Sequence, residues 1–207
     1  MPIVDSEGFA LATGPRQIIR DLAADVIPAD SIEADQQAQI LAWVDSGAPL
    51  FRIAKPATPP QHLAVYFALL DDTDRSLLLV DHVKSQAVLL TGGHVDDQED
   101  PRVSVVREAD EELRLDAKFH DVAGDRPLFL SVTQTRGPDS HTDVTLWFVL
   151  ATSRHQKLEP DADEFTAINW LPLDSTDWTA AHFDPHMARF VAKLIASLNV
   201  LPSTSKI

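Results

Sequence analysis

The sequence predicts a mixed α/β layered domain that follows an N-terminal helical hairpin. Beyond residue 61, strand-like segments are interrupted by helical patterns, which is typical of a sheet covered by helices. Before that point the chain has two helical patterns and then a proline cluster, AKPATPP at 54–60, that marks a boundary. We therefore divide the chain into an N-terminal helical extension with a Pro-rich linker (1–60) and a folded domain (61–207).

The N-terminal extension is predicted to hold two helices. The first follows Pro15, a residue that suits the first turn of a helix. Apolar residues then recur at helical spacing: Ile18, Ile19, Leu22, Ala23 and Val26. The second helix is expected to run from Ser31 as N-cap to Gly47 just beyond its end. A hairpin of this size has no independent core, so its apolar side must be buried either against the domain or in a homodimer.

The domain is predicted to combine six strands with two helices. The strand-like segments are residues 62–71, 76–82, 86–91, 127–136, 142–152 and 165–173. The sequence DDTDR (71–75) suits a tight turn between the first two strands. One helix is expected from Pro101 to about Leu115. A closing helix is expected to begin with Asp184 as N-cap and Pro185 as its first residue.

Length, charge and cysteine content exclude several classes of function. At 207 residues the chain is one domain, or one domain with an appendage. It carries 32 acidic residues against 17 Lys and Arg, and a net charge of −15 disfavours nucleic acid and anionic membranes as partners. The absence of cysteine excludes disulfides, thiolate metal sites and cysteine nucleophiles. Because neither a signal peptide nor an apolar run of ~20 residues is present, we expect a cytoplasmic protein.

The segment GGHVDDQEDPRVSVVREADEELRL (92–115) contains the candidate metal ligands. On a helix, Glu108, Glu111 and Glu112 fall on one face within an arc of about 100°. Each like-charged pair costs roughly 0.2–0.5 kcal/mol in an isolated helix, and a divalent cation reverses that effect. Mg²⁺ and Mn²⁺ prefer such carboxylate oxygens, and a turn at Gly92 would let a backbone carbonyl join them. The alternative interpretation is a solvated acidic face.

The same segment resembles the signature of the Nudix hydrolases. That signature reads Gly, five residues, Glu, seven residues, then Arg-Glu-apolar-any-Glu-Glu-any-Gly-apolar. The positions that match it are Gly93, Glu99, Arg107, Glu108, Ala109, Glu111, Glu112 and Leu115. The departure is Arg114, where the family has a Gly that allows a left-handed turn. Arg would cost roughly 1–2 kcal/mol in that conformation, so we expect the loop after the helix to differ. The resemblance implies a Nudix-like α/β/α sandwich with a mixed sheet.

The resemblance also implies an activity. Nudix hydrolases cleave a diphosphate bond in a nucleoside diphosphate linked to another moiety, so a small-molecule nucleotide is the expected partner and Mg²⁺ or Mn²⁺ the expected cofactor. By the same resemblance, Arg107 would orient the metal-binding carboxylates. Glu99 would support the site through water or through Arg107. The implied metal ligands are Glu108, Glu111, Glu112 and Gly92.

The attacking water needs a carboxylate that takes its proton. By the resemblance this base is a glutamate of the signature, such as Glu108, or one outside it, Glu164, with Asp161 and Asp163 as rivals. A catalytically silent Nudix-like module that binds or senses a nucleotide is the alternative function. Such modules usually lose carboxylates of the signature, and all four are present here, which favours the enzyme.

Four further residues are candidates for substrate binding, with solvated side chains as the alternative. Lys84 precedes the signature and His94 follows its glycine pair, where each can reach a phosphate. Arg136 and His141 flank a predicted hairpin loop, GPDS. His141 and Asp143 also suggest a metal site, but no third ligand stands at a suitable spacing in the sequence. No further motif indicates which nucleotide derivative is hydrolysed.

Overall fold

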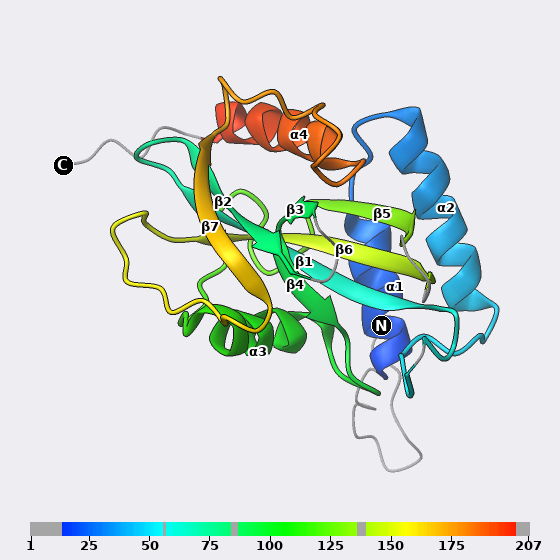
Figure 1. The fold of residues 1–207 in the computed structure, drawn as a ribbon. Coiled ribbons are helices and arrows are strands. Elements are labelled where there is room, and N and C mark those ends of the chain that lie inside the picture. Colours follow the sequence, from blue (N-terminus) through cyan, green and yellow to red (C-terminus); the bar gives the residue numbers. More distant parts are fainter. Residues whose placement is uncertain (1–13, 56, 84–86, 136–139, 202–207) are drawn as a thin grey trace, which may run out of the picture.

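The computed structural model describes residues 14–55, 57–83, 87–135 and 140–201. Within them, seven strands form one mixed sheet, with helices on both of its faces (Figure 1). The strands are β1 (Gln61–Asp71), β2 (Ser76–His82), β3 (Ala87–Leu89), β4 (Thr91–His94), β5 (Phe129–Gln134), β6 (Thr142–Ala151) and β7 (Phe165–Pro172). The helices are α1 (Pro15–Asp25), α2 (Ser31–Asp45), α3 (Pro101–Leu113) and α4 (Met187–Val200). This architecture confirms the predicted α/β/α sandwich preceded by a helical hairpin. Among the described residues, no helix has the length and apolar character needed to cross a membrane.

The central strand, β1, is bordered by three others. It runs parallel to β6 from Gln61 to Leu70. Its opposite edge is shared, because β4 pairs antiparallel with its first half and β2 with its last residues. Beyond that point β2 diverges from β1 and pairs with β3 and β7, while β5 completes the other side of the sheet next to β6. The first half of β1 therefore lies between β4 and β6.

Side chains along β1 alternate between two apolar layers, as the two-residue period of a strand requires. Leu63, Val65 and Phe67 point into the layer that α3 closes. Ala68 and Leu70 point into the layer that α4 closes. Figure 1 shows α3 and α4 on opposite faces of the sheet. The parity of a position on β1 therefore decides which helix its side chain faces.

The N-terminal hairpin is packed against the sheet. Its buried side chains join the layer that α3 closes: Ile19, Leu22, Ala23, Val26, Ile40 and Val44. The side chain of Gln36 donates to the carbonyl of Val132 at 3.3 Å, so α2 covers the outer edge of β5. Near the start of α2, the buried carboxylate of Glu33 pairs with Lys193 of α4 at 2.7 Å. Of the two predicted arrangements, the hairpin adopts the one that buries its apolar side against the domain.

The start of α2 differs by one residue from the prediction. Asp30, not Ser31, is the N-cap: its backbone is extended, with φ −150°, and its carboxylate accepts from the N–H of Glu33 at 2.8 Å. A carboxylate at this position also interacts favourably with the positive end of the helix. The predicted end is confirmed, because Gly47 lies just beyond α2 with φ 80°.

Two other boundaries also differ. The Asp184 carboxylate accepts from the N–H of His186 at 2.7 Å, which forms a turn, and α4 begins only at Met187. The predicted strand at 86–91, whose first residue lies outside the described part of the chain, is divided into β3 and β4. The chain leaves β2 and joins β1 at Leu90, so no single strand can satisfy both edges.

Arg114 ends α3 in the left-handed conformation, with φ 51° and ψ 41°. Its N–H donates to the carbonyl of Asp110 at 2.9 Å, and the N–H of Leu115 donates to that of Ala109 at 3.1 Å. These bonds satisfy carbonyls that the helix end would otherwise leave unpaired. The expectation that the loop would differ was therefore wrong, because Arg114 adopts the turn that a glycine would make.

We predict that Arg114→Gly stabilises the protein by about 1 kcal/mol, because glycine adopts the left-handed conformation without steric cost. Little is lost with the side chain, which is exposed and lies 3.7 Å from Asp110. Urea unfolding measures the change. Arg114→Ala keeps the Cβ and is the control, so equal stabilisation by both variants would contradict the explanation.

We predict that Ile40→Ala destabilises the protein by about 2–5 kcal/mol, because it leaves a cavity between the hairpin and the sheet. Ile32→Ala on the same helix is the control, since Ile32 is about half exposed and should cost far less. Thermal or urea unfolding of the full chain measures both. Similar effects of the two variants would show that the hairpin is not part of the core.

Candidate functional site

The candidate site lies where α3 meets β4. Asp100 caps α3, its carboxylate accepting from the N–H of Arg102 at 2.9 Å, and Pro101 opens the first turn. The helix then brings the three predicted carboxylates onto neighbouring positions: Glu108, Glu111 and Glu112. The glycine pair of β4 lies against two of them, and its backbone takes part in the contact.

Both glycines are needed for this close approach. A Cβ at Gly93 would overlap the carboxylate of Glu108, and a Cβ at Gly92, where φ is 152°, would overlap the carbonyl of Val65. The N–H of Gly92 donates to the Glu112 carboxylate at 3.1 Å. The absence of side chains at these positions therefore lets two carboxylates of α3 reach the backbone of β4.

Arg107 joins the parts of the signature. Its guanidinium donates to Glu99 at 3.0 Å, to Glu108 at 2.8 Å and to Glu111 at 3.4 Å. It also donates to the carbonyl of His94 at 3.2 Å, which ties α3 to the end of β4. The positive charge of the Arg107 guanidinium is thus shared among three carboxylates. Arg107 therefore contacts three acids of the signature and the backbone of β4.

Glu99 differs electrostatically from the acids of α3. Burial acts to raise its pKa, but hydrogen bonds from Arg107 and from the Ser104 hydroxyl, which is 2.6 Å away, outweigh it, and the pKa of Glu99 is lowered. Glu99 is therefore a stable anion whose contacts hold Arg107 in place.

If both were ionised, Glu108 and Glu112 would carry more negative charge than the surrounding protein neutralises. Burial raises the pKa of Glu112 to about 9, and the charges of Glu108 and Glu164 add to the effect. Burial also raises the pKa of Glu108, although Arg107 opposes it. The side chain of Glu112 is only 5% exposed, so water screens it poorly. An all-oxygen donor set with unneutralised charge fits a hard divalent cation such as Mg²⁺ or Mn²⁺.

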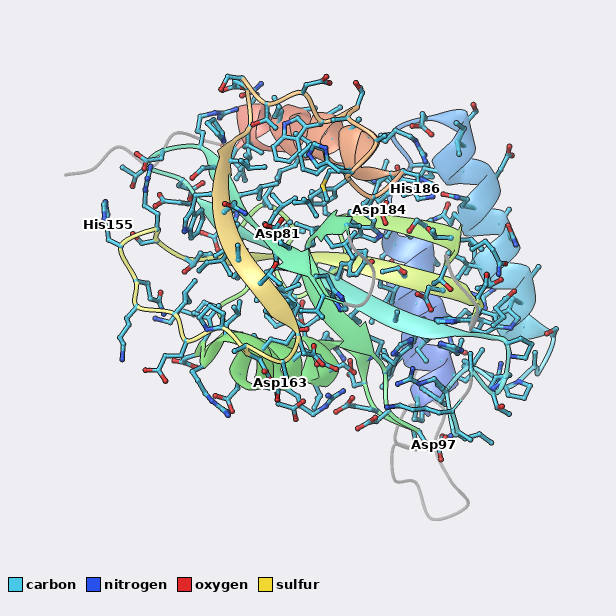
Figure 2. All side chains as sticks on the ribbon, in the orientation of Figure 1. Asp81, Asp97, His155, Asp163, Asp184 and His186 are labelled. Carbon is cyan, nitrogen blue, oxygen red and sulfur yellow. The ribbon has the colours of Figure 1, made fainter. Side chains whose placement is uncertain are left out.

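Glu164 is an outside carboxylate whose charge acts on both Glu108 and Glu112, whereas the charge of Asp161 acts on Glu112. Glu164 precedes β7, and its negative charge raises the pKa of both Glu108 and Glu112. The N–H of Asp161 donates to the backbone carbonyl of Glu112 at 2.9 Å, which holds this loop against the end of α3. Asp163 instead closes a turn within the loop and is exposed, as Figure 2 shows.

Of the four candidate substrate-binding residues, the structure describes two, His94 and His141, and they group with other residues than the acids of α3. Lys84 and Arg136 lie outside the described residues. His94 and His141 come together, with ring centroids 5.8 Å apart. Beside them are Asp143 and a residue that the sequence analysis missed, His62. The conclusion that His141 and Asp143 have no third partner was wrong, because spacing along one segment cannot reveal ligands that come from other strands.

A match to a known protein family covers the part of the chain that contains these residues. The family model described as the NUDIX domain matches residues 60–194. Among curated proteins, none matches this sequence.

Several solved structures are similar to the chain. The MutT protein from Methanosarcina mazei Go1 is 15% identical with a TM-score of 0.53, and the match covers 69% of this chain and 97% of that one. A C. elegans Ap4A hydrolase is 15% identical with a TM-score of 0.52, covering 67% and 98% of the two chains. The E. coli dihydroneopterin triphosphate pyrophosphohydrolase is 13% identical with a TM-score of 0.52, covering 72% and 99%. At these identities the likeness shows a shared fold.

We predict that the metal-free protein loses stability as the pH rises from about 4.5 to about 9. Folding raises the pKa of Glu112 from 4.5 to about 9. The raised pKa therefore stabilises the folded state fully only below about pH 4.5, where this carboxyl is protonated in the unfolded chain as well. As the pH rises through this window the unfolded chain ionises first, and that contribution is lost. Urea unfolding with a chelator, across this pH range, measures the slope. Glu112→Gln should flatten it, and parallel slopes in the two proteins would contradict the assignment.

Proposed function

The chain belongs to the NUDIX domain family, and we propose that it is a divalent-metal-dependent hydrolase of a nucleoside diphosphate linked to another moiety. The bond cleaved would be a diphosphate bond, which makes the protein a pyrophosphohydrolase. The observation that carries this proposal is the pair Glu108 and Glu112, which lies against the glycines of β4, is largely removed from water, and is only partly neutralised, by the contact of Arg107 with Glu108. A merely solvated acidic face would not bury its carboxylates.

We assign the metal-binding role to four residues of α3 and β4. Carboxylate oxygens would come from the three glutamates of the helix, and a backbone oxygen from β4: Glu108, Glu111, Glu112 and Gly92. When bound, a divalent cation would neutralise phosphoryl charge and lower the pKa of the attacking water. Two further residues support the site. Arg107 orients Glu108 and Glu111, and Glu99 holds Arg107.

The general base is proposed to be Glu108 or Glu164. Each has a carboxylate beside the others, and a base works best when its pKa lies near the working pH. Burial and the charges of Glu111 and Glu164 raise the pKa of Glu108 toward that range, although Arg107 opposes them. A bound cation would neutralise part of the negative charge around these acids. Either carboxylate would then be free to accept the proton of a water.

The substrate is proposed to be a small nucleotide derivative. Two structural relatives are named for the hydrolysis of Ap4A and of dihydroneopterin triphosphate, both of which contain phosphoanhydride bonds. A panel of nucleoside diphosphate derivatives and nucleoside triphosphates, assayed with Mg²⁺ and with Mn²⁺ for release of phosphate or pyrophosphate, would identify the class.

On the best substrate of that panel, we predict that Glu111→Gln lowers Mg²⁺-dependent turnover by orders of magnitude, because it removes a charged metal ligand. Its stability without metal should stay level or rise slightly, since repulsion between neighbouring carboxylates is relieved. The Arg107 contact that is lost is long, 3.4 Å, and exposed. Steady-state kinetics and urea unfolding measure the two effects.

Asp110→Asn is the matched control. Asp110 is the next residue on the same helix, it is exposed, and its carboxylate is 3.7 Å from Arg114 rather than near Arg107. The substitution removes the same charge, so it should leave turnover within about twofold if only the clustered acids bind metal. Equal turnover in the Glu111 and Asp110 variants would overturn the assignment of the hydrolase site to these glutamates.

A further inference from the structure

Four ligand-type side chains converge on the face of the sheet opposite α3. They are His62, His94, His141 and Asp143, and one potential ligand atom from each lies within 4.8 Å of the others. The strand register explains the cluster. His62 of β1 stands opposite Asp143 of β6, and His94 of β4 stands opposite Ala64, two residues along β1 from His62.

This histidine cluster is separate from the acids of α3. Gly93 stands opposite Val65, whose side chain points into the layer that α3 closes, and it is Gly93 that lies against Glu108. His94, one residue further, points to the other face because side chains alternate along a strand. The two groups of residues therefore occupy opposite faces at the end of β4.

The distances suit a small cation. The Nε2 atoms of the histidines lie 3.4 Å (His62), 3.6 Å (His94) and 3.2 Å (His141) from Oδ1 of Asp143. In a tetrahedral zinc site with bonds of about 2.0–2.1 Å, neighbouring ligand atoms are about 3.3 Å apart. The three histidine nitrogens therefore already stand at this spacing from the carboxylate. The widest separation in the group, 4.8 Å, requires the imidazoles to close around the ion.

The hydrogen bonding of His62 leaves its Nε2 available as a ligand atom. The ring is fully buried, and its Nδ1 lies 2.9 Å from the carbonyl of Pro59, which can only accept, so Nδ1 carries the hydrogen. The Nε2 lone pair of His62 then faces Oδ1 of Asp143, which is 3.4 Å away. Within the part of the chain that the structure describes, three buried atoms have no hydrogen-bond partner: His62 Nε2, His94 Nε2 and Asp143 Oδ1.

We infer that His62, His94, His141 and Asp143 form a second metal site, which binds a divalent transition ion of the Zn²⁺ class. Imidazole nitrogen suits Zn²⁺ and similar ions, whereas Mg²⁺ prefers oxygen throughout. The outer contacts are those expected of metal-binding histidines. Nδ1 of His62 donates to a backbone carbonyl, and Nδ1 of His141 lies 3.2 Å from the Thr135 hydroxyl. In this assignment His94 and His141 bind metal rather than substrate.

An ion bound at this site would connect three strands at the points where they begin or end. His62 lies near the start of β1, His94 at the end of β4, and Asp143 near the start of β6. The carbonyl of His94 also accepts from Arg107, so an ion here would fix the backbone next to the glycine pair. The inference does not rest on the hydrolase proposal, because its tests measure metal binding and unfolding and not turnover.

The first experiment uses the full chain, stripped of metal and then kept in excess Mg²⁺ to occupy the carboxylate site. Co²⁺ is added as a spectroscopic substitute for Zn²⁺. We expect one equivalent to produce the visible d–d absorption of a four-coordinate site with nitrogen and oxygen ligands, and Zn²⁺ to displace it. Absence of this absorption under excess Mg²⁺ would overturn the inference.

The second experiment compares variants. Asp143→Asn and His141→Gln should each weaken Zn²⁺ binding at least about 10-fold, the loss that even a change outside the ligand shell produces. His62→Gln should do the same; His141 is partly exposed, so its variant keeps the test valid if the buried replacement does not fold. The matched control is His155→Gln, since Figure 2 shows His155 on the loop between β6 and β7, and this exposed residue is not one of the four that converge. Glu111→Gln should leave the Co²⁺ absorption unchanged.

Thermal unfolding separates a cation site from an anion site. Zn²⁺ should raise the Tm of the stripped wild-type chain but not that of Asp143→Asn, because a ligand that binds only the folded state stabilises it. Inorganic phosphate is the opposing probe. If phosphate, and not Zn²⁺, raised the Tm in a manner that depends on His62, the histidines would bind an anion and the inference would be overturned. Unchanged Zn²⁺ affinity in Asp143→Asn would overturn it as well.

Discussion

The close approach of α3 to β4 is the constraint on which the rest of the structure depends. Two glycines without side chains let the carboxylates of Glu108 and Glu112 lie against backbone, where they are poorly solvated. Burial of two like charges at such a place is unfavourable unless something positive compensates. Arg107 supplies part of that charge, and the proposed divalent cation would supply the remainder. The pKa of Glu112, raised to about 9, is the physical sign of this incomplete compensation.

The sheet register extends the same geometry to the opposite face. The last residue of β4 lies beside the start of β1, and the start of β6 lies on the other edge of β1. Gly93 and His94 are adjacent in sequence but point to opposite faces, so a single short strand contributes to two groups of polar side chains. The α1–α2 hairpin contributes apolar side chains to the layer that α3 closes. The two groups of polar side chains lie at the ends of strands, outside that apolar layer.

The sequence could predict those features that depend on local patterns. The helix from Pro101, the glutamate face and the ends marked by Pro15 and Gly47 all follow from spacing within one segment. Asp30 was missed because Asp and Ser cap helices equally well, and only backbone geometry distinguishes neighbours. The expectation for the loop after Arg114 was wrong because it weighed only the steric cost of the left-handed conformation and not the two hydrogen bonds formed there. His62 could not be found at all, because its partners are set by strand register between distant segments.

The acids of α3 and the histidine cluster also differ in the kind of cation that their ligand atoms favour. The acids of α3 offer only oxygen, and a hard ion such as Mg²⁺ keeps water among its ligands, which leaves room for a phosphate. The histidine cluster offers three nitrogens and one oxygen, enough to complete a four-coordinate shell without water or substrate. A filled shell holds structure, whereas an open one permits chemistry. The donor sets therefore favour a catalytic ion beside α3 and a structural ion on the opposite face, joined through the carbonyl of His94 and Arg107.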